Sequence, residues 1–370
     1  MTILVTGGAG FIGSHLVDAL VERGDRVRVL DHLEPQVHRG KKPGTLNPKA
    51  EYLFHNVLEE SILPKALEGI EVVVHLAALV GVAQSMYQMT RYMENNTLAT
   101  TKFLQFLVNR KPRLRKLVVA SSMSIYGEGL YRCQEHSLVS PPLRSQEQLA
   151  KHLWELSCPA CGKTLTPLHT PESKPLQPNS VYAISKRDQE ELALTVAQAY
   201  RFPAVALRFF NVYGPRQSLS NPYTGACAIF SARLRHGKPP VIYEDGRQCR
   251  DFIHVSDLTR AILIALDHPQ AQGAALNVGT GENSSILQVA EGLAAAYRVR
   301  LTPTIAHRYR AGDVRHCFAD ISRLKALGFT PRLGLKEGLE DLVRWGSTAE
   351  AEDLFQEAEQ ELIERRLLGD

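Results

Sequence analysis

A tyrosine and a lysine four residues apart, Tyr182 and Lys186, could together remove a proton from a hydroxyl group. Residues at that spacing share one face of a helix, so both side chains can point at one ligand. A phenol titrates at about pH 10, but positive charges within a few Å favour the phenolate and lower its pKa by about 1–3. The spacing therefore predicts that Tyr182 is a general base activated by Lys186.

A glycine-rich stretch near the start of the chain has the composition of a phosphate-binding turn. Apolar residues 3–5 before it are typical of a buried parallel strand, and the apolar residues after it recur at helical spacing. Glycines there let backbone N–H groups approach a pyrophosphate at the helix N-terminus. Gly8 also fits the more familiar glycine spacing, so the subtype stays open. We expect a dinucleotide to contact Gly7, Gly10, Phe11, Ile12 and Gly13, and its oxidised nicotinamide ring to be a second positive charge beside the tyrosine.

Asp31 favours NAD over NADP. It follows a second predicted strand, 26–30, about twenty residues past the glycine turn, where an acidic side chain accepts from an adenosine ribose hydroxyl. An NADP site would offer a cation there, but the next residues are His32, Leu33 and Glu34.

Alternating strands and helices must position these groups. Residues 72–76, 116–120 and 204–208 read as buried strands, and 92–109 and 181–200 read as helices. The pattern predicts an α/β fold with a Rossmann-type doubly wound parallel sheet. We expect a dinucleotide-binding domain over 1–212, a substrate-binding lobe over 213–347, and a charged C-terminal helix over 348–370 that packs on the surface. Residues 255–275 belong either to the lobe or, by a return of the chain, to the first domain.

Composition narrows the class of protein. With 370 residues and 44% hydrophobic content, the chain can bury a large core. A net charge of +4 is weak support for nucleic acid, so we expect no such partner. There is no apolar run of transmembrane length and no N-terminal signal region, which predicts a cytoplasmic protein without a membrane partner.

The chain resembles the extended short-chain dehydrogenase/reductase superfamily, in its branch of nucleotide-sugar epimerases and dehydratases. The motifs that carry this resemblance run almost from end to end. Besides the glycine turn and the Tyr182–Lys186 pair they are His75-Leu-Ala-Ala78, Asn95-Asn96, Ala120-Ser-Ser-Met-Ser-Ile-Tyr-Gly127, Arg208-Phe-Phe-Asn211, Tyr213-Gly-Pro-Arg-Gln217, Arg250-Asp-Phe-Ile-His254 and Arg310-Ala-Gly-Asp313.

The resemblance implies roles for individual residues. Ser122 corresponds to the hydroxyl that bonds the reacting sugar oxygen and relays its proton, and Lys186 would also hold the nicotinamide ribose. The implied substrate contacts are Ser122, Ser124, Tyr182, Asn211, Arg250, Arg310 and, more weakly, Arg216. The further implied cofactor contacts are Asn56, Val57, Leu76, Ala77, Ala78 and Asn96.

Two residues after Ser122 bear on the type of reaction. Family dehydratases carry an Asp-Glu pair directly after this hydroxyl, whereas Met123 and Ser124 stand here. Neither can replace an acid that donates a proton. The resemblance therefore implies an NAD-dependent 4-epimerase that works through a transient 4-keto sugar.

The segment between Tyr126 and Tyr182 is about twice as long as in most relatives. It contains two pairs of metal-binding residues, Cys133 with His136 and Cys158 with Cys161, at the spacing of a structural zinc site. We expect a zinc knuckle within an insert over 130–176, with His169 as a rival fourth ligand; the alternative is a loop with incidental thiols.

This insert, together with the downstream segment 214–225, resembles the dTDP-L-rhamnose 4-epimerase group. Alternatives are a UDP-hexose or UDP-uronate 4-epimerase and an NAD-dependent 4-ketoreductase. A non-enzymatic alternative is a dinucleotide-sensing scaffold with a zinc docking module. The expected partner is a dTDP- or UDP-linked sugar, and the resemblance implies a homodimer that pairs the helices at 92–109 and 181–200.

Overall fold

A seven-stranded parallel sheet forms the centre of the structure, a computed structural model that describes residues 1–110 and 114–370. The strand order is β14-β9-β5-β4-β1-β2-β3. From β1 the chain adds β2 and β3 on one side and then returns to add β4 and the later strands on the other side, as in a doubly wound sheet. The strands are β1 (Thr2–Thr6), β2 (Arg26–Leu30), β3 (Glu51–Leu53), β4 (Val72–His75), β5 (Lys116–Ser122), β9 (Ala204–Phe209) and β14 (Ala274–Val278).

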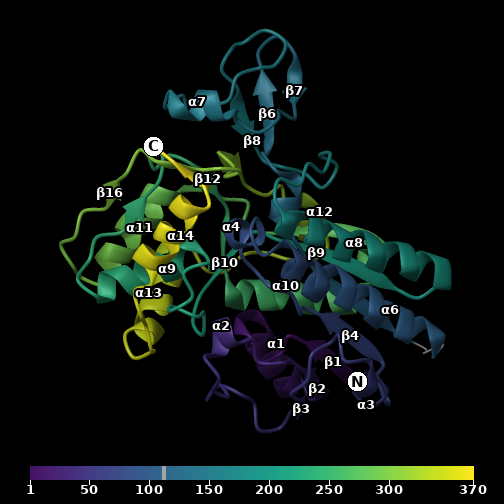
Figure 1. The fold of residues 1–370 in the computed structure, drawn as a ribbon. Helices are drawn as coiled ribbons and strands as arrows, with labels where there is room; N and C mark the ends of the chain where they lie inside the picture. Colours follow the sequence, from purple (N-terminus) through teal and green to yellow (C-terminus); the bar gives the residue numbers. More distant parts are fainter. Residues whose placement is uncertain (111–113) are drawn as a thin grey trace.

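Helices cover both faces of this sheet (Figure 1). One apolar core joins the strands to α1 (Phe11–Glu22) and α10 (Val255–Asp267). The other joins them to α3 (Leu63–Ala66), α6 (Ala99–Asn109) and α8 (Val181–Tyr200). Because both faces are covered, β1, β4, β5 and β9 are largely buried on both sides, which is why they read as continuous hydrophobic runs. The predicted α/β Rossmann-type sheet is confirmed.

The chain comes back to the main sheet after it has entered the second lobe. Helix α10 packs against α1 and β5, and β14 then pairs in parallel with β9 at the edge of the sheet. Residues 255–278 therefore pack with the main sheet and its helices, although they lie beyond residue 212 in the sequence.

The expected helix at 92–109 is not one regular helix. It consists of α5 (Met89–Tyr92), a π-helical segment, η2 (Met93–Leu98), and α6. A π-helical turn shifts the side chains that follow it relative to a regular α-helix, and such turns are frequent at functional sites. Here it carries Asn95 and Asn96.

The second lobe has its own apolar core, formed by α9 (Ala226–Arg235), α11 (Ile286–Ala296) and α13 (Leu335–Gly346). Short paired strands lie within this lobe and where the chain enters it from the first domain. They are β10 (Asn211–Tyr213) with β13 (Phe252–His254), β11 (Val241–Ile242) with β16 (Thr304–Ile305), and β12 (Cys249–Arg250) between β15 (Ser284–Ser285) and β18 (His316–Cys317).

The segment between Tyr126 and Tyr182 forms a small three-stranded module that projects from the body of the molecule (Figure 1). Its elements are β6 (Leu130–Cys133), β7 (Ser137–Val139), α7 (Gln146–Ala150) and β8 (Thr166–Leu168). Buried charges attach it to the lobe: Arg144 of the module donates two hydrogen bonds of 2.8 and 2.9 Å to Glu244, which also pairs with the fully buried Arg315.

The C-terminal region departs from the expected single helix over 348–370. A helix, α14, covers only Phe355–Glu364, and the chain then forms β19 (Leu368–Gly369), which pairs antiparallel with β17 (Tyr309–Arg310). The remaining short elements are α2 (Pro35–His38), η1 (Glu60–Ile62), α4 (Val82–Ser85), η3 (Met123–Tyr126), η4 (Pro269–Ala271) and α12 (Ser322–Ala326). Among the described residues, no helix is long and apolar enough to cross a membrane.

Candidate active site

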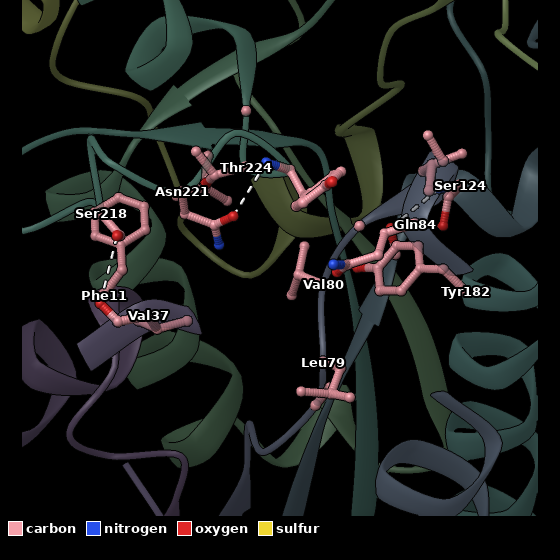
Figure 2. A pocket seen from close by; sticks show the side chains of 18 of the residues that line it. Phe11, Val37, Leu79, Val80, Gln84, Ser124, Tyr182, Ser218, Asn221 and Thr224 are labelled. Carbon is pink, nitrogen blue, oxygen red and sulfur yellow. Dashed lines mark hydrogen bonds between the residues drawn. The ribbon is translucent and has the colours of Figure 1, made fainter. Parts of the chain in front are cut away.

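A cavity of about 600 Å³ lies where the carboxyl ends of β1, β2, β4 and β5 meet the second lobe. This edge is where open parallel sheets bind their ligands. Figure 2 shows Tyr182, Ser124 and Gln84 together in one part of the pocket, and Phe11, Val37 and Ser218 together in another. The predicted chemical groups and the predicted dinucleotide turn therefore line one continuous cavity.

The glycine turn has the geometry of a phosphate cradle. Gly7 has φ +71°, and a Cβ there would lie 2.9 Å from the backbone nitrogen of Ala77. A Cβ on Gly13 would lie 2.2 Å from the carbonyl oxygen of Gly7, so only glycine allows the helix to approach the turn. Gly10 is the N-cap of α1 and offers no side-chain cap. The first N–H groups of that helix can therefore bind a pyrophosphate, and the residues present fit a dinucleotide.

Asp31 lies directly after β2 and faces the same cavity. Its carboxylate accepts hydrogen bonds from the backbone N–H of Ala9 at 2.9 Å and of Leu33 at 2.8 Å. These bonds fix the carboxylate between the glycine turn and the end of β2. Each oxygen keeps a free lone pair, so the group can still accept from a ribose hydroxyl.

Most of the other expected cofactor residues line the cavity as well. They are Phe11, Ile12, Asn56, Val57, Leu76, Ala77 and Ala78.

Asn96 is an exception to that prediction. Its side chain is fully buried, accepts from the backbone N–H of Leu79 at 2.7 Å and donates to the Leu79 carbonyl and to Ser185. Because every polar atom of the amide is used inside the protein, Asn96 holds the loop after β4 against α8 instead of lining the cavity. Asn95, in the same π-helical turn, lines the cavity instead. The sequence analysis did not predict this residue as part of the site.

Tyr182 lies in the first turn of α8, buried in the cavity wall. The N-cap hydroxyl of Ser180 accepts from the N–H of Ala183 and fixes where this helix begins. The backbone N–H of Tyr182 donates to Ser85, and its ring meets the ring of Tyr92 edge to face, with centroids 6.4 Å apart. The ring orientation is therefore set by two neighbouring elements.

Burial raises the pKa of Tyr182, and a hydrogen bond with Ser122 opposes this rise. The direction is opposite to the lowering that the sequence analysis expects. The reason is that desolvation penalises the phenolate. A positive charge brought by a ligand has to supply the lowering.

Lys186 is buried one helical turn after Tyr182 and donates to the side chain of Gln189 at 2.6 Å. Burial lowers the pKa of Lys186 to about 7, although the negative charge of Glu190 opposes this. The ammonium group is thus poorly solvated in the protein alone. Polar oxygen atoms of a ligand would favour its charged form.

Ser122 and Ser124 form a hydroxyl pair at the end of β5. Their side-chain oxygens are 2.9 Å apart, and the Ser122 oxygen also accepts from the backbone N–H of Ser124. Both line the cavity with Met123 between them. This part of the wall carries hydroxyl groups and a thioether, and no carboxylate is contributed at those three positions.

Asn211, Arg250 and Arg310 line the half of the cavity that belongs to the second lobe. Within the residues that the structure describes, the buried side-chain oxygen of Asn211 has no hydrogen-bond partner, as expected of an atom that meets a ligand. Arg250 donates to the backbone carbonyls of Cys249 and Arg315, which fixes its guanidinium.

Arg216 does not join this group. Its guanidinium pairs with Asp18 of α1 at 2.7 Å, outside the residues that line the cavity. The short loop after β10 turns the side chain toward α1, with φ +68° at Arg216 itself. Arg216 therefore does not line the cavity in this structure, and its contact with the substrate stays a prediction.

Comparisons with known proteins agree with this geometry. A family model described as the NAD dependent epimerase/dehydratase family matches residues 3–164 and 146–279. A curated relative, dTDP-L-rhamnose 4-epimerase of Burkholderia thailandensis, is 35% identical over 347 residues, which cover 93% of this chain and 94% of that protein. The chain belongs to the NAD-dependent epimerase/dehydratase family.

Solved structures of this family share the fold over nearly the whole chain. UDP-glucose 4-epimerase of Thermotoga maritima, solved with UDP-glucose, has a TM-score of 0.77 and 30% identity, covering 93% of this chain and 98% of that one. UDP-glucose 4-epimerase of Thermus thermophilus, solved in complex with NAD, has a TM-score of 0.75 and 29% identity, covering 95% and 100%. The resemblance to the epimerase branch is confirmed.

The projecting module of this epimerase-family chain brings four possible metal ligands together. The ligand atoms of Cys133, His136, Cys158 and Cys161 all lie within 4.8 Å of one another. The Cys133 and Cys161 sulfurs are 3.6 Å apart, and the His136 Nδ1 is 3.5 Å from the Cys158 sulfur. Ligands of a tetrahedral zinc ion at about 2.0–2.3 Å from the metal would be separated by about 3.5 Å, so the donor set fits zinc.

His169, the rival fourth ligand, lies outside this cluster. Its ring is hydrogen-bonded to the carbonyl oxygen of Gly281 at 2.9 Å and packs edge to face on Phe318. The β6–β7 turn brings His136 to the cysteines instead.

The sequence analysis missed a further wall of the cavity. Tyr223 and Tyr243 come from loops of the lobe, and four residues come from α14: Phe355, Ala358, Glu359 and Leu362. The apolar period of α14 was visible in the sequence, but periodicity alone does not tell whether the face that it marks packs on a core or on a ligand site.

Proposed function

We propose that the protein is an NAD-dependent nucleotide-sugar 4-epimerase that acts on a dTDP-deoxysugar such as dTDP-L-rhamnose. The observation that carries this proposal is the shared cavity, in which Tyr182 and Ser122 lie between the glycine turn and the arginines of the second lobe. The relative in Burkholderia thailandensis supports the dTDP-linked substrate, and the UDP-glucose complex from Thermotoga maritima keeps a UDP-hexose or UDP-uronate as the alternative.

The cofactor would be held by the glycine turn, Asp31 and the cavity residues after β3 and β4. When bound, NAD+ supplies a hydride acceptor that takes the hydrogen from C4 of the sugar and returns it to either face. Lys186 would hold the nicotinamide ribose, and its ammonium would regain its charge beside those hydroxyl oxygens.

Tyr182 would take the proton of the C4 hydroxyl and give it back at the end of the cycle. Ser122 and Tyr182 line the same part of the cavity, and Ser122 opposes the rise in the pKa of the phenol, so Ser122 would relay the proton from the sugar oxygen to the phenol. Ser124, bonded to Ser122, would orient that hydroxyl. Because burial alone raises the pKa of Tyr182, this base would be effective only when the positive nicotinamide ring is present, which links deprotonation to an assembled site.

Asn211, Arg250 and Arg310 would hold the diphosphate while the sugar turns. Arginine suits phosphate because its planar fork makes paired charged hydrogen bonds. In the structure Arg310 pairs with Asp313 at 2.8 Å, so a diphosphate would have to replace or share that partner. Binding at the diphosphate leaves the sugar free to present either face, as epimerisation requires.

Met123 and Ser124 favour epimerisation over dehydration. Elimination of water needs a proton donor and a second base near the sugar, and a thioether and a hydroxyl perform neither task well.

The projecting module, in this proposal, is a structural zinc knuckle with Cys133, His136, Cys158 and Cys161 as ligands. Four protein ligands leave no open position, so the metal would not take part in the reaction. The proposed division of the chain follows the sequence analysis, with a cofactor domain over 1–212 to which 255–275 returns, a substrate lobe over the rest of 213–347 and a C-terminal segment over 348–370.

A homodimer is proposed through α5, η2 and α8. Met89, Leu98 and Ile184 on these elements are 54%, 44% and 41% exposed, which is unusual for large apolar side chains on neighbouring helices.

Incubation with a panel of dTDP- and UDP-sugars, followed by separation of the C4 isomers, tests the proposed reaction. An epimerase would bring one sugar of the panel to a mixture of two isomers without consuming NADH. Stoichiometric NADH consumption with a 4-keto sugar would identify a ketoreductase instead. If NAD is bound but no sugar of the panel is converted, the result would favour the non-enzymatic alternative, a dinucleotide-sensing scaffold.

A further inference from the structure

The C-terminal helix α14 presents one face to the cavity. The four cavity-lining residues, Phe355, Ala358, Glu359 and Leu362, follow the spacing i, i+3, i+4, i+7. That spacing marks a single stripe of a helix. The intervening Gln356, Glu357 and Gln360 are exposed. The helix is therefore a wall of the cavity, with its polar side toward solvent.

The start of α14 packs against groups of the nucleotide half of the cavity. The ring of Phe355 lies 6.3 Å from the ring of Tyr243, and the Arg310 guanidinium lies 5.2 Å above that same tyrosine. The hydroxyl of Tyr243 donates to Glu359 at 3.0 Å, and Arg308 pairs with Glu359 at 3.2 Å. Two aromatic rings, a carboxylate and the Arg310 guanidinium therefore lie together at the start of α14.

The end of α14 reaches toward the part of the cavity that contains Tyr182. Glu361 accepts from the hydroxyl of Tyr223, and Arg365 lies 5.3 Å over the ring of Tyr87. Tyr223 lines the cavity and approaches Gly81, beside Tyr92 and its partner Tyr182. The helix therefore extends along the substrate side of the cavity and does not merely touch its rim.

After α14 the chain turns back and β19 pairs with β17, the strand that carries Arg310. The N–H of Ala311 donates to the carbonyl of Leu367 at 2.9 Å, which extends this pairing by one residue. The C-terminal segment therefore fixes the backbone at Arg310, the residue proposed to bind the diphosphate.

We propose that residues 355–369 are a substrate-binding element, in which Phe355 and Glu359 determine affinity for the nucleoside diphosphate part of the nucleotide sugar. This inference rests on the proposed function and deepens it. Phe355 would support the ring of Tyr243, and the pyrimidine base would pack against that ring. Glu359, already held by Tyr243 and Arg308, would accept from a hydroxyl of the ribose or deoxyribose, since a carboxylate can accept from hydroxyls but repels phosphate.

Binding of dTDP and of UDP to purified protein, measured by titration calorimetry, tests this element without any turnover. Phe355→Ala and Glu359→Gln should each weaken the tighter of the two nucleotides about tenfold, as expected for loss of an aromatic contact or of a charged hydrogen bond. Glu357→Gln, an exposed change on the same helix, should bind within about twofold of the parent protein and serves as the control. NAD content should be equal in all variants.

Amide hydrogen exchange gives a second measurement that does not depend on a substitution. Addition of the tighter nucleotide should slow exchange in 355–369 and leave exchange in α7 of the projecting module unchanged. Unchanged nucleotide affinity in both variants, or no slowing in 355–369, would overturn the inference. If no sugar is epimerised but both variants bind dTDP or UDP more weakly than the parent protein does, the inference stands and the proposed reaction alone fails.

Discussion

At the scale of single residues, the proposed reaction depends on one phenolic oxygen. Tyr182→Phe keeps the ring that packs on Tyr92 and removes only that oxygen. We expect the turnover number to fall roughly 10²–10⁴-fold, the usual contribution of a general base, with NAD content unchanged. Separation of the C4 isomers over time measures turnover, and absorbance of the released cofactor measures NAD.

A matched control for this change is Tyr126→Phe. Tyr126 is a buried tyrosine near the same strand end, but its hydroxyl bonds to Asn277 and Arg208. The two variants should differ in turnover. If both variants lose turnover to a similar extent, or if Tyr182→Phe keeps near-normal turnover, Tyr182 is not the general base.

Single residues also show where a sequence is sufficient and where it is not. The glycines could be predicted because the close approach of Gly7 and Gly13 to other backbone excludes any side chain. Asn96 and Arg216 could not be placed, because one π-helical turn and one loop bend decide which way each points. Such local backbone choices depend on tertiary packing and not on residue type.

At the scale of elements, a buried histidine joins β1, β4 and α6. His75 bonds to Thr6 at 2.8 Å and to Thr100 at 2.9 Å and stacks on Phe103. Burial, helped by the charge of Lys186, lowers the pKa of His75 to about 3. The unfolded chain therefore binds a proton at this residue before the folded one does.

The consequence is an acid sensitivity that can be measured. The contribution of His75 to stability is fully present above about pH 6.5 and is lost as the pH falls from there toward 3, at up to about 1.4 kcal/mol per pH unit. In urea unfolding between pH 7.5 and 4.5, His75→Asn should show a shallower loss of unfolding free energy than the parent. Replacement of the exposed His307 by Asn should leave the slope unchanged; parallel slopes for all three proteins would contradict the prediction.

The projecting module gives a prediction about metal. Protein purified without chelator should contain about one zinc per chain, and Cys158→Ser should lose it, because three remaining ligands bind zinc far more weakly. Cys249→Ser, at an isolated thiol bonded to the carbonyl of Arg247, should keep the metal. Elemental analysis measures zinc, and a metal-free parent protein would contradict the assignment.

Among the elements, the long apolar strands and α8 were predictable from periodicity. The short strand β3 and the sheet edge β14 were not, since β3 has three residues and β14 lies far along the chain after the lobe. The place of α14 on the cavity wall was also beyond reach, because only the fold brings residue 355 next to Tyr243.

At the scale of the whole molecule, the proposed dimer can be tested through its exposed apolar side chains. Leu98→Glu would place a charge in the middle of the proposed helix pairing, and burial of an unpaired carboxylate is costly. We expect the variant to elute with the mass of a monomer in size-exclusion chromatography with light scattering. Leu138→Glu, at a 62% exposed leucine of the projecting module, should keep the dimer.

The attachment of the projecting module limits how this enzyme could be shortened by protein engineering. Excision of 130–176 would remove Tyr131 and Arg144, which are the phenol donor of the buried Glu128 and a cation partner of the buried Glu244. Breaking such a buried pair from one side typically costs about 3–5 kcal/mol, a large fraction of a domain's stability. A shortened enzyme would therefore need apolar residues in place of both carboxylates. The rest of the fold now relies on the projecting module for its stability.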